Sequence, residues 1–350
     1  MRRSAALLLV LMALLSACSS SLPGPAATQH RIRIGFLLDT LQEERWQRDR
    51  DLFVGRAREL GAEVLVQSAA GDDDLQLSQA ENMLRRGVDI LVIVPHNAKA
   101  MAPAVTMAHA AGVQVIAYDR LIRDADVDMY ISFDNERVGE LQAEQMVGLV
   151  PRGNYVYIGG AETDNNASML QAGVMKVLQP LIDKGDILLV YNKFTPDWRP
   201  EEAERNMEQA LVKANEKVDA VLCGNDATAG GAVQALYRHK LAGRVPVAGQ
   251  DADLAAVQRI VQGTQVITVY KPIRLLATKA AEMAVAMATG RRYDVNNAID
   301  NGRRHVPAFL LPPVPVDIHN LRETVIKDGF HPEQDVFGPA NPAPRPASTP

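Results

Sequence analysis

Four short polar clusters stand directly after apolar runs of the chain, and they hold residue types that bind small polar molecules. The clusters are His96-Asn97, Asp119-Arg120, Asn225-Asp226 and Asp251. Carboxylates accept hydrogen bonds, arginine donates them in a fixed fork, and asparagine does both. Such a set suits a neutral polyol better than an anion, which would need a surplus of positive charge. Taken singly, each cluster is equally well explained as a helix cap or a loop ion pair.

The two tryptophans, Trp46 and Trp198, also stand in polar surroundings, although aromatic residues make up only 5% of the chain. Trp46 follows Glu44-Arg45, and Trp198 follows Pro196-Asp197. The apolar face of a sugar ring packs on an aromatic plane while the ring edge forms hydrogen bonds. We therefore expect one tryptophan from each half of the chain to clamp a sugar ring. The alternative is that each tryptophan anchors a hydrophobic core or a helix start.

No combination of residues predicts catalysis. The sequence holds no G-x-S-x-G, no H-E-x-x-H and no complete P-loop. Its seven histidines show no helical pair at metal-ligand spacing. Asp72-Asp73-Asp74 lacks the glycine of a calcium loop, and we expect Gly230 and Gly231 to allow close helix packing rather than to hold a phosphate. The sequence therefore predicts neither an enzyme nor a cofactor or metal site.

Short apolar runs alternate with amphipathic stretches from residue 31 onward. We predict strands at residues 32–38, 63–66, 89–94, 113–117, 129–132, 155–158, 187–190, 220–222, 245–248 and 266–269. Helical patterns lie between them, for example at residues 44–60, 75–86, 199–215 and 228–238. This order is typical of parallel βαβ units, and the near-continuous Val, Ile and Leu runs fit sheets that are covered on both faces.

The two halves of the chain repeat one pattern. Residues 88–97 and 113–120 are echoed by residues 218–226 and 245–251 at a nearly constant offset. A chance match in a valine-rich chain is the alternative, but the repetition favours an α/β fold with two similar open parallel-sheet lobes. Ligands of such sheets bind outside the carboxyl ends of the strands. We therefore expect the four polar clusters to line one cleft shared by the lobes.

Composition limits the function further. With 47% hydrophobic and 23% charged residues, the 350-residue chain has ordinary globular composition. Its formal net charge of −5 argues against a general nucleic-acid binder. Two cysteines, Cys18 and Cys223, cannot form a disulfide scaffold. We expect Cys223 to be a buried strand residue.

The N-terminus has the pattern of an export signal. Arg2-Arg3 precedes an apolar run that is too short to span a bilayer. Leu15-Ser16-Ala17-Cys18 resembles the lipobox of bacterial lipoproteins, so we expect cleavage before Cys18 and lipidation of its thiol. A signal without lipidation is the alternative. We assign residues 1–17 to a lipoprotein signal peptide, residues 18–30 to a tether, and the proline-rich residues 332–350 to a disordered tail.

Several segments closely resemble the periplasmic D-xylose-binding proteins of bacteria. They include Ala117-Tyr118-Asp119-Arg120 and Tyr270-Lys271-Pro272, together with residues 44–51, 130–136, 225–232 and 249–254. The resemblance runs from about residue 32 to about residue 331. It implies the type I periplasmic binding protein fold of the ribose and galactose binders, with two lobes joined by a three-segment hinge. The implied crossings lie near residues 133–135, 270–272 and 301–304.

The resemblance also implies the extent of each lobe. The N-terminal lobe would hold residues 31–133 plus 272–301, and the C-terminal lobe residues 134–271 plus 302–331. Carried over residue by residue, it implies a sugar site made of Arg45, Trp46, Asp119, Arg120, Asn165, Asn166, Trp198, Asn225, Asp251 and Lys271. Which of Asn165 and Asn166 points inward stays open at this point.

The implied function is capture of a monosaccharide and its delivery to an ABC transporter permease. D-Xylose is the expected ligand; arabinose, ribose and glucose differ from it by one hydroxyl orientation or one CH₂OH group. The resemblance implies a monomer in the periplasm or on the outer face of the cell membrane, held to the membrane only by its lipid. A sugar sensor for a membrane receptor is the alternative function.

Overall fold

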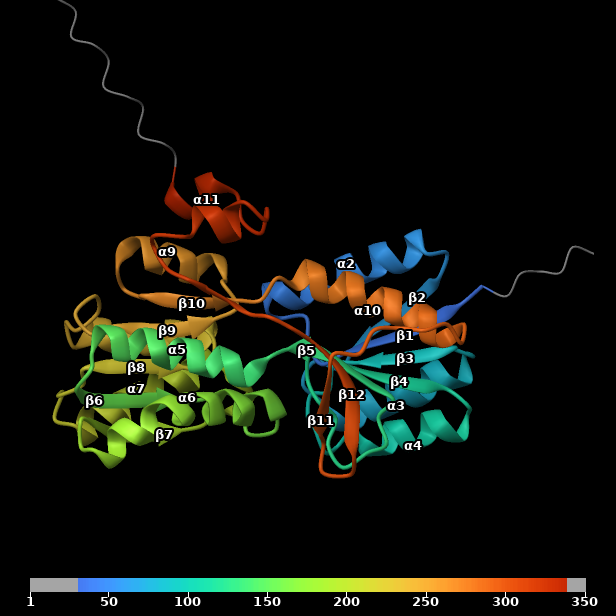
Figure 1. The fold of residues 1–350 in the computed structure, drawn as a ribbon, viewed down its shortest axis with the longest axis horizontal. Coiled ribbons are helices and arrows are strands. Elements are labelled where there is room, and N and C mark those ends of the chain that lie inside the picture. The colour runs from blue at the N-terminus through green and yellow to red at the C-terminus, as the bar shows by residue number, and fades with distance from the viewer. Residues whose placement is uncertain (1–30, 339–350) are drawn as a thin grey trace, which may run out of the picture. The chain divides into compact units, whose positions relative to one another are not determined.

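The computed structural model describes residues 31–338, and residues 32–338 form two α/β lobes, each built on its own sheet (Figure 1). Residues 1–30 and 339–350 lie outside the described part. The predicted signal peptide, lipidated Cys18, the tether and most of the predicted tail therefore fall outside it too. Among the described helices, none has both the length and the apolar character needed to cross a membrane.

The first sheet has seven strands in the order β11-β12-β5-β4-β3-β1-β2, and only β11 is antiparallel to its neighbour. Alternate residues of β1 face opposite sides, so Phe36 packs in the core beneath α2 and α10, while Leu37 packs in the core beneath α3 and α4. The elements are β1 (Arg33–Leu38), α2 (Glu44–Glu59), β2 (Glu63–Ser68), α3 (Asp73–Arg85), β3 (Ile90–Ile93), α4 (Ala102–Ala110), β4 (Gln114–Tyr118), β5 (Met129–Phe133), α10 (Ile273–Ala288), β11 (Asn297–Asp300) and β12 (His305–Leu311).

The second sheet has six strands in the order β13-β10-β9-β8-β6-β7. The core of one face takes residues from α5 and α6, and that of the other face from α7 and α8. The elements are α5 (Asn135–Leu149), β6 (Gly153–Ile158), α6 (Asn165–Asp183), β7 (Ile187–Lys193), η1 (Pro196–Trp198), α7 (Pro200–Lys213), β8 (Ala220–Cys223), α8 (Asp226–Arg238), β9 (Val247–Gln250), α9 (Leu254–Gln262), β10 (Ile267–Tyr270) and β13 (Val314–Val316).

The two sheets repeat one strand order, β5-β4-β3-β1-β2 in the first and β10-β9-β8-β6-β7 in the second. The predicted fold class of two similar parallel-sheet lobes is therefore confirmed. All ten apolar runs that were predicted as strands are strands. The sequence echo corresponds to β3 and β4 in the first lobe and β8 and β9 in the second. The polar clusters follow these four strands at equivalent places.

One predicted boundary between the lobes is wrong. The chain passes from the first sheet toward the second after β5, returns after β10, and passes again between β12 and β13, at Pro312-Pro313. The third crossing is therefore not at residues 301–304, and residues 302–311 belong to the first lobe. Residues 301–304 instead close the hairpin of β11 and β12, where the buried Asn301 donates hydrogen bonds to the carbonyls of Ile122 and Ala125.

The predicted disordered tail also begins too early. Pro332 is the N-cap residue of the short helix α11 (Glu333–Phe337). Val336 of α11 is buried in a small core with residues of α9, β10, β13 and η2 (Arg322–Ile326). Residues 332–337 are thus packed against the second lobe. The prediction failed because a proline-rich composition does not reveal that one apolar side chain, Val336, is placed to enter a core.

Gly231 allows the close helix packing that was predicted for it. A Cβ at Gly231 would lie 2.1 Å from the Pro200 carbonyl oxygen, so α8 approaches the start of α7 closely. Gly230 faces the side chain of Arg259 instead, at 3.2 Å from such a Cβ. The thiol of Cys223 is buried in β8, and burial raises its pKa, which keeps it unreactive.

Candidate functional site

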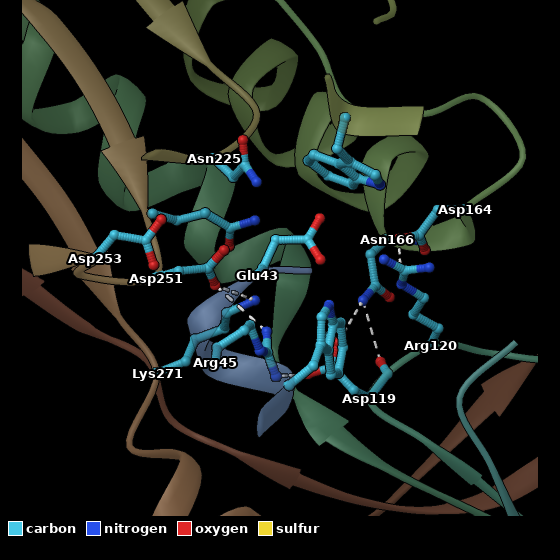
Figure 2. Close-up of a pocket in the computed structure, with 13 residues that line it drawn as sticks. Glu43, Arg45, Asp119, Arg120, Asp164, Asn166, Asn225, Asp251, Asp253 and Lys271 are labelled. Carbon is cyan, nitrogen blue, oxygen red and sulfur yellow. Dashed lines mark hydrogen bonds and ion pairs between the residues drawn. The ribbon is translucent and has the colours of Figure 1, made fainter. Parts of the chain in front are cut away.

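One pocket collects side chains that follow the carboxyl ends of strands in both lobes (Figure 2). The first lobe contributes residues of the loop after β1, the start of α2, and the segment after β4. The second lobe contributes residues that follow β6, β7, β8, β9 and β10. The lining residues are Glu43, Arg45, Trp46, Asp119, Arg120, Asp164, Asn166, Trp198, Asn225, Gln250, Asp251, Asp253 and Lys271.

Arg45 is the centre of a buried ion-pair network that joins the lobes. Its Nη2 donates to Asp119 Oδ2 at 2.7 Å, its Nε to Asp49 Oδ2 at 3.3 Å, and its Nη1 to Asp251 Oδ1 of the second lobe at 3.4 Å. Lys271 Nζ lies 2.8 Å from the same oxygen of Asp251. Burial opposes the charged form of Arg45, but the three carboxylates outweigh it and raise its pKa well above the usual value.

The Asp119 carboxylate stays ionised in this network. Burial would raise its pKa, but the charges of Arg45 and Lys271 lower it below the usual value. The backbone of Asp119 has a φ of 61°, a left-handed conformation that is uncommon outside glycine. Its carbonyl oxygen holds this conformation because it accepts from Tyr130 Oη at 3.0 Å, Ser132 Oγ at 2.6 Å and Asn166 Nδ2 at 3.1 Å. Strain of this kind gathers at functional sites.

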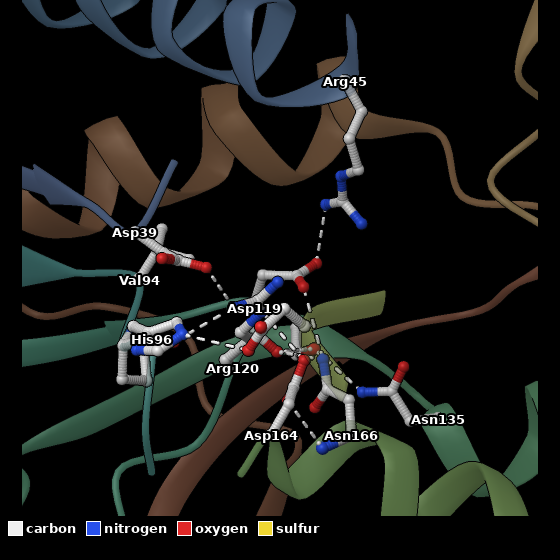
Figure 3. A network of polar contacts seen from close by, with 12 residues as sticks. Asp39, Arg45, Val94, His96, Asp119, Arg120, Asn135, Asp164 and Asn166 are labelled. Carbon is white, nitrogen blue, oxygen red and sulfur yellow. Dashed lines mark hydrogen bonds and ion pairs between the residues drawn. The ribbon is translucent and has the colours of Figure 1, made fainter. Parts of the chain in front are cut away.

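Arg120 forms a second bridge between the lobes (Figure 3). Its Nη1 donates to Asp39 Oδ2 at 2.7 Å, and its Nε lies 2.8 Å from Asp164 Oδ2 in the second lobe. All three side chains are almost fully buried. A guanidinium held by carboxylates on both sides presents its donors in one fixed direction.

The two tryptophans belong both to the pocket and to the hydrophobic cores. Trp46 lies beneath two cations, with its ring centroid 4.2 Å from the Arg45 guanidinium carbon and 5.2 Å from that of Arg120. The ring of Trp198 sits against glycine backbone, and a Cβ at Gly160 would lie 2.1 Å from it. Each ring is thus a core residue of its own lobe that also lines the pocket.

Three polar atoms of the pocket are buried without a hydrogen-bond partner within residues 31–338. They are Glu43 Oε2, Gln250 Oε1 and Trp198 Nε1. A buried polar atom that stays unpaired costs about 1–3 kcal/mol. Two acceptors and one donor around one pocket therefore suit a ligand that both donates and accepts hydrogen bonds.

The charges of the pocket favour a neutral ligand over an anionic one. Five carboxylates face three cations; the carboxylates are Glu43, Asp119, Asp164, Asp251 and Asp253, and the cations are Arg45, Arg120 and Lys271. Burial, together with the nearby Asp226 and Asp251, raises the pKa of Asp253 well above its usual value.

Across residues 31–338, no group of His, Cys, Asp and Glu side chains has the geometry of a metal site.

Comparison with known proteins gives the family. A model of the periplasmic binding protein domain matches residues 34–292. The chain is 51% identical over 324 residues to the D-xylose-binding periplasmic protein of Escherichia coli. The alignment covers 92% of this chain and 98% of that protein. It is 50% identical to the D-xylose-binding periplasmic protein of Haemophilus influenzae, over 94% of this chain and 98% of the relative.

The chain belongs to the periplasmic binding protein family. A solved relative is the carbohydrate transporter solute binding protein of Chloroflexus aurantiacus in complex with D-glucose. It is 32% identical, superposes with a TM-score of 0.82, and covers 87% of this chain and 98% of its own. These relatives are binding proteins, which agrees with the expectation that the chain is no enzyme.

Nine of the ten residues predicted for the site line the pocket of this periplasmic binding protein. The tenth, Asn165, lies outside it, and its Oδ1 accepts from Arg123 Nη1 of the other lobe at 2.9 Å. Asn166 is the one that lines the pocket. Burial distinguishes these two neighbours at the start of α6, because Asn166 is almost fully buried and Asn165 is half-buried.

Three residues of the polar clusters are structural instead. Asn97 Oδ1 accepts from the backbone N–H of Lys99 at 3.0 Å, in the manner of a turn or cap. Asp226 is fully buried and accepts from Thr268 Oγ1 at 2.7 Å. His96 lines a neighbouring cavity, and its Nδ1 lies 2.8 Å from Asp73 Oδ1. The alternative explanation, a helix cap or a loop ion pair, is thus right for these side chains.

Asn225 both caps a helix and lines the pocket. Its Oδ1 accepts from the Thr228 N–H at 2.9 Å in a capping box at the start of α8, and the residue also lines the pocket.

Four pocket residues were not predicted from the sequence, and they are Glu43, Asp164, Gln250 and Asp253. Each is the direct or near neighbour of a predicted site residue, so position along the chain gave the only available signal. Asp164 caps α6 by accepting from the Asn166 N–H at 2.9 Å, and it pairs with Arg120 as well.

Proposed function

We propose that this periplasmic binding protein captures D-xylose in the pocket between its lobes and delivers it to an ABC importer. The observation that carries the proposal is the pocket itself, where ion-paired carboxylates and cations from both lobes surround buried polar atoms without partners, among them Gln250 Oε1 and Trp198 Nε1. A sugar hydroxyl donates one hydrogen bond and accepts others, so it can satisfy both kinds of atom. The relatives from Escherichia coli and Haemophilus influenzae, which are about 50% identical to this chain, are named as D-xylose-binding proteins.

Hydrogen bonds select the ligand in this proposal. The Asp119 and Asp251 carboxylates are ion-paired, and they hold acceptor positions that a hydroxyl fills. Trp46 and Trp198 supply apolar faces for the C–H side of the ring. A ligand that lacks one of these hydroxyls leaves a buried charged group unpaired, which a site of this kind rejects strongly. Asn225 and Asn166 add amide groups that both donate and accept.

Closure of the lobes is part of the proposed mechanism. Direct contacts cross between the lobes beside the pocket, for example Ala98 N–H to the Thr163 carbonyl at 3.0 Å and Arg123 to Asn165 at 2.9 Å. A hinge motion at the three crossings would make and break them. Closure excludes water and strengthens each hydrogen bond to the sugar. Part of the binding energy offsets closure, and we expect a dissociation constant of about 1 μM or below, about −8 kcal/mol.

The proposed location follows from the N-terminal pattern. Lipidation at Cys18 would hold the protein on the outer face of a membrane or in the periplasm, where a permease can receive the loaded form. Replacement Cys18→Ala is expected to move the protein from the detergent phase to the aqueous phase in a Triton X-114 partition. Mass spectrometry of the mature N-terminus gives a direct check, and an unmodified Cys18 would overturn the anchor.

Isothermal titration calorimetry with an aldose panel tests the ligand. We expect D-xylose to bind with a dissociation constant of about 1 μM or below, and L-arabinose and D-ribose to bind more weakly. Binding also stabilises the protein by RT ln(1 + [L]/Kd), about 2.7 kcal/mol at a hundredfold excess over Kd. No heat and no thermal shift with any aldose would overturn the sugar-binding proposal. Undiminished xylose uptake after deletion of the gene would overturn the transport role.

A further inference from the structure

Glu43 is a pocket residue whose side chain has one buried oxygen without a partner among residues 31–338. It is the residue before the first turn of α2, yet its side chain makes no capping hydrogen bond to that helix. Its Oε2 is buried without a partner within the described chain. Figure 2 shows its carboxylate directed into the space that the labelled pocket residues enclose. A carboxylate in this position is therefore free to meet a ligand.

Three other carboxylates of the pocket, those of Asp119, Asp164 and Asp251, are already paired with cations. Asp119 pairs with Arg45 at 2.7 Å, and Asp251 pairs with Lys271 at 2.8 Å. Burial raises the pKa of Glu43, and a hydrogen bond from its own backbone N–H together with the charge of Arg120 only partly offsets this. Glu43 thus differs from Asp119 and Asp251 because it forms no ion pair among the described residues, and a hydrogen-bond donor that reaches Glu43 Oε2 stabilises its burial further.

A second cavity adjoins the pocket on the side of Glu43. It shares Glu43, Arg120 and Trp198 with the pocket and continues to Asp39 and His96. The space open to the centre of a water-sized sphere is about 190 Å³ in the second cavity and about 30 Å³ in the pocket, so the second cavity is the roomier of the two. There is thus room beyond the pocket for atoms that extend outward from a sugar ring.

A second unpartnered oxygen lies in this cavity. Asp39 Oδ2 accepts from Arg120 at 2.7 Å, while Asp39 Oδ1 is buried and has no partner among residues 31–338. The Asp39 side chain is only 7% exposed. Two buried carboxylate oxygens, one from Glu43 and one from Asp39, therefore border the space beyond the pocket, and both accept hydrogen bonds only.

We propose that Glu43 is a specificity-determining residue that binds the exocyclic hydroxyl of an aldohexose whose C6 extends into the second cavity. This proposal rests on the proposed sugar-binding function. A pentopyranose has no exocyclic carbon, so its ring leaves the second cavity empty and Glu43 without a donor. The C6 hydroxyl of D-glucose is a donor at the end of a short flexible arm. The chain therefore binds aldohexoses in addition to D-xylose, and Glu43 selects those that carry the 6-hydroxyl.

The test compares D-glucose with 6-deoxy-D-glucose, which differ only in this hydroxyl. Titration calorimetry of the whole protein gives the ratio of the two dissociation constants. A hydrogen bond to a charged group contributes about 1.5–3 kcal/mol, so we expect wild-type protein to bind D-glucose about 10- to 150-fold more tightly than 6-deoxy-D-glucose. In Glu43→Leu the ratio is expected to fall to about 1, and in Glu43→Gln to an intermediate value.

Glu44→Gln is the matched control. Glu44 is the next residue along the chain, but its side chain is 48% exposed and pairs with Arg48 at the surface. The ratio in Glu44→Gln is expected to equal that of wild type. The absence of a side-chain cap at Glu43 means that its replacement removes no helix-capping bond, and a thermal melt of each variant verifies folding.

Three results would overturn the proposal. They are D-xylose binding without D-glucose binding, equal affinity of wild type for D-glucose and 6-deoxy-D-glucose, or a ratio that persists in Glu43→Leu. Failure of the sugar-binding function itself looks different, because then no aldose binds to wild type at all.

Discussion

Arg45 of the first lobe donates a hydrogen bond from Nη1 to Asp251 Oδ1 of the second lobe at 3.4 Å. The same oxygen lies 2.8 Å from Lys271 Nζ, in the second crossing between the lobes. One carboxylate thus joins the cation at the start of α2 to the cation of a hinge segment. A sugar hydroxyl bound at Asp251 would contact the point where both lobes and one crossing meet, which links ligand binding to closure.

Replacement of Arg45 is expected to abolish sugar binding and to destabilise the protein. Arg45→Met leaves Asp119 and Asp49 buried without their cation, and breaking a buried pair in this way costs about 3–5 kcal/mol. Calorimetry should show a loss of affinity of at least about 100-fold, and urea denaturation should show the loss of stability. Arg50→Met on the same helix is the control, because Arg50 lies outside the pocket and pairs with the exposed Asp51. Wild-type affinity in Arg45→Met would contradict the central role of this network.

A methyl group at Gly160 is expected to displace Trp198 from the pocket. A Cβ there would lie 2.1 Å from the Trp198 ring, so the ring must move. We expect Gly160→Ala to weaken sugar binding about 10-fold or more, with a stability loss of about 1–3 kcal/mol from overpacking. In Gly148→Ala, on the exposed face of α5, an added Cβ meets no atom within 4 Å. That control should keep its affinity and gain up to about 1 kcal/mol of stability.

The adjacent asparagines at the start of α6 are expected to act differently. Asn166→Ala removes a pocket amide and its bond to the Asp119 carbonyl, so the affinity should fall about 10-fold or more. Asn165→Ala removes only the bond from Arg123, so release of sugar should become a few-fold faster because the closed form is weakened. Stopped-flow measurement of the dissociation rate separates the two effects.

A double-mutant cycle checks the pairing of Asn165 with Arg123. The effects of Asn165→Ala and Arg123→Ala on the dissociation rate should be non-additive, because both remove one interaction. Fully additive effects, or a greater loss of affinity in Asn165→Ala than in Asn166→Ala, would show that Asn165 contacts the sugar directly.

Asp49 is expected to make stability depend on pH. Burial raises the pKa of Asp49 from 3.8 to about 6, although Arg45 and Tyr118 oppose the shift. The folded state therefore holds the proton more tightly than the unfolded state, and this stabilisation is present below pH 4 and lost as the pH rises through 6. Relative to Asp49→Asn, wild type should lose about 3 kcal/mol of unfolding free energy between about pH 4 and pH 7. Parallel pH profiles of the two proteins would contradict this assignment.

Local sequence was enough for the elements and for part of the candidate site, while Arg45, Asn166 and Lys271 were expected only from the family resemblance. Val and Ile runs predict buried parallel strands because both faces of such a sheet must be apolar. The echo of residues 88–97 at 218–226 predicts two equivalent lobes, and the structure has β3 and β8 at equivalent places. Asp119, Asn225 and Asp251 could be predicted because parallel strands bring their carboxyl ends to one edge.

Other features depended on contacts between distant residues. The third crossing was misplaced because β12 pairs with β5 across more than 150 residues of sequence, which no local pattern encodes. The tail was assigned too early because burial of Val336 depends on α9 and β13.

The sequence, read together with its family resemblance, determined the fold class, the two lobes and nine residues that line the pocket. Only the tertiary structure decided that Asn166 rather than Asn165 enters the pocket, that Glu43 keeps an unpaired oxygen there, and that Arg45 joins the lobes. The physical reason is the range of the interactions. Strand and helix patterns arise from neighbours along the chain, whereas pairing, burial and the pKa of a carboxyl depend on groups that folding brings together.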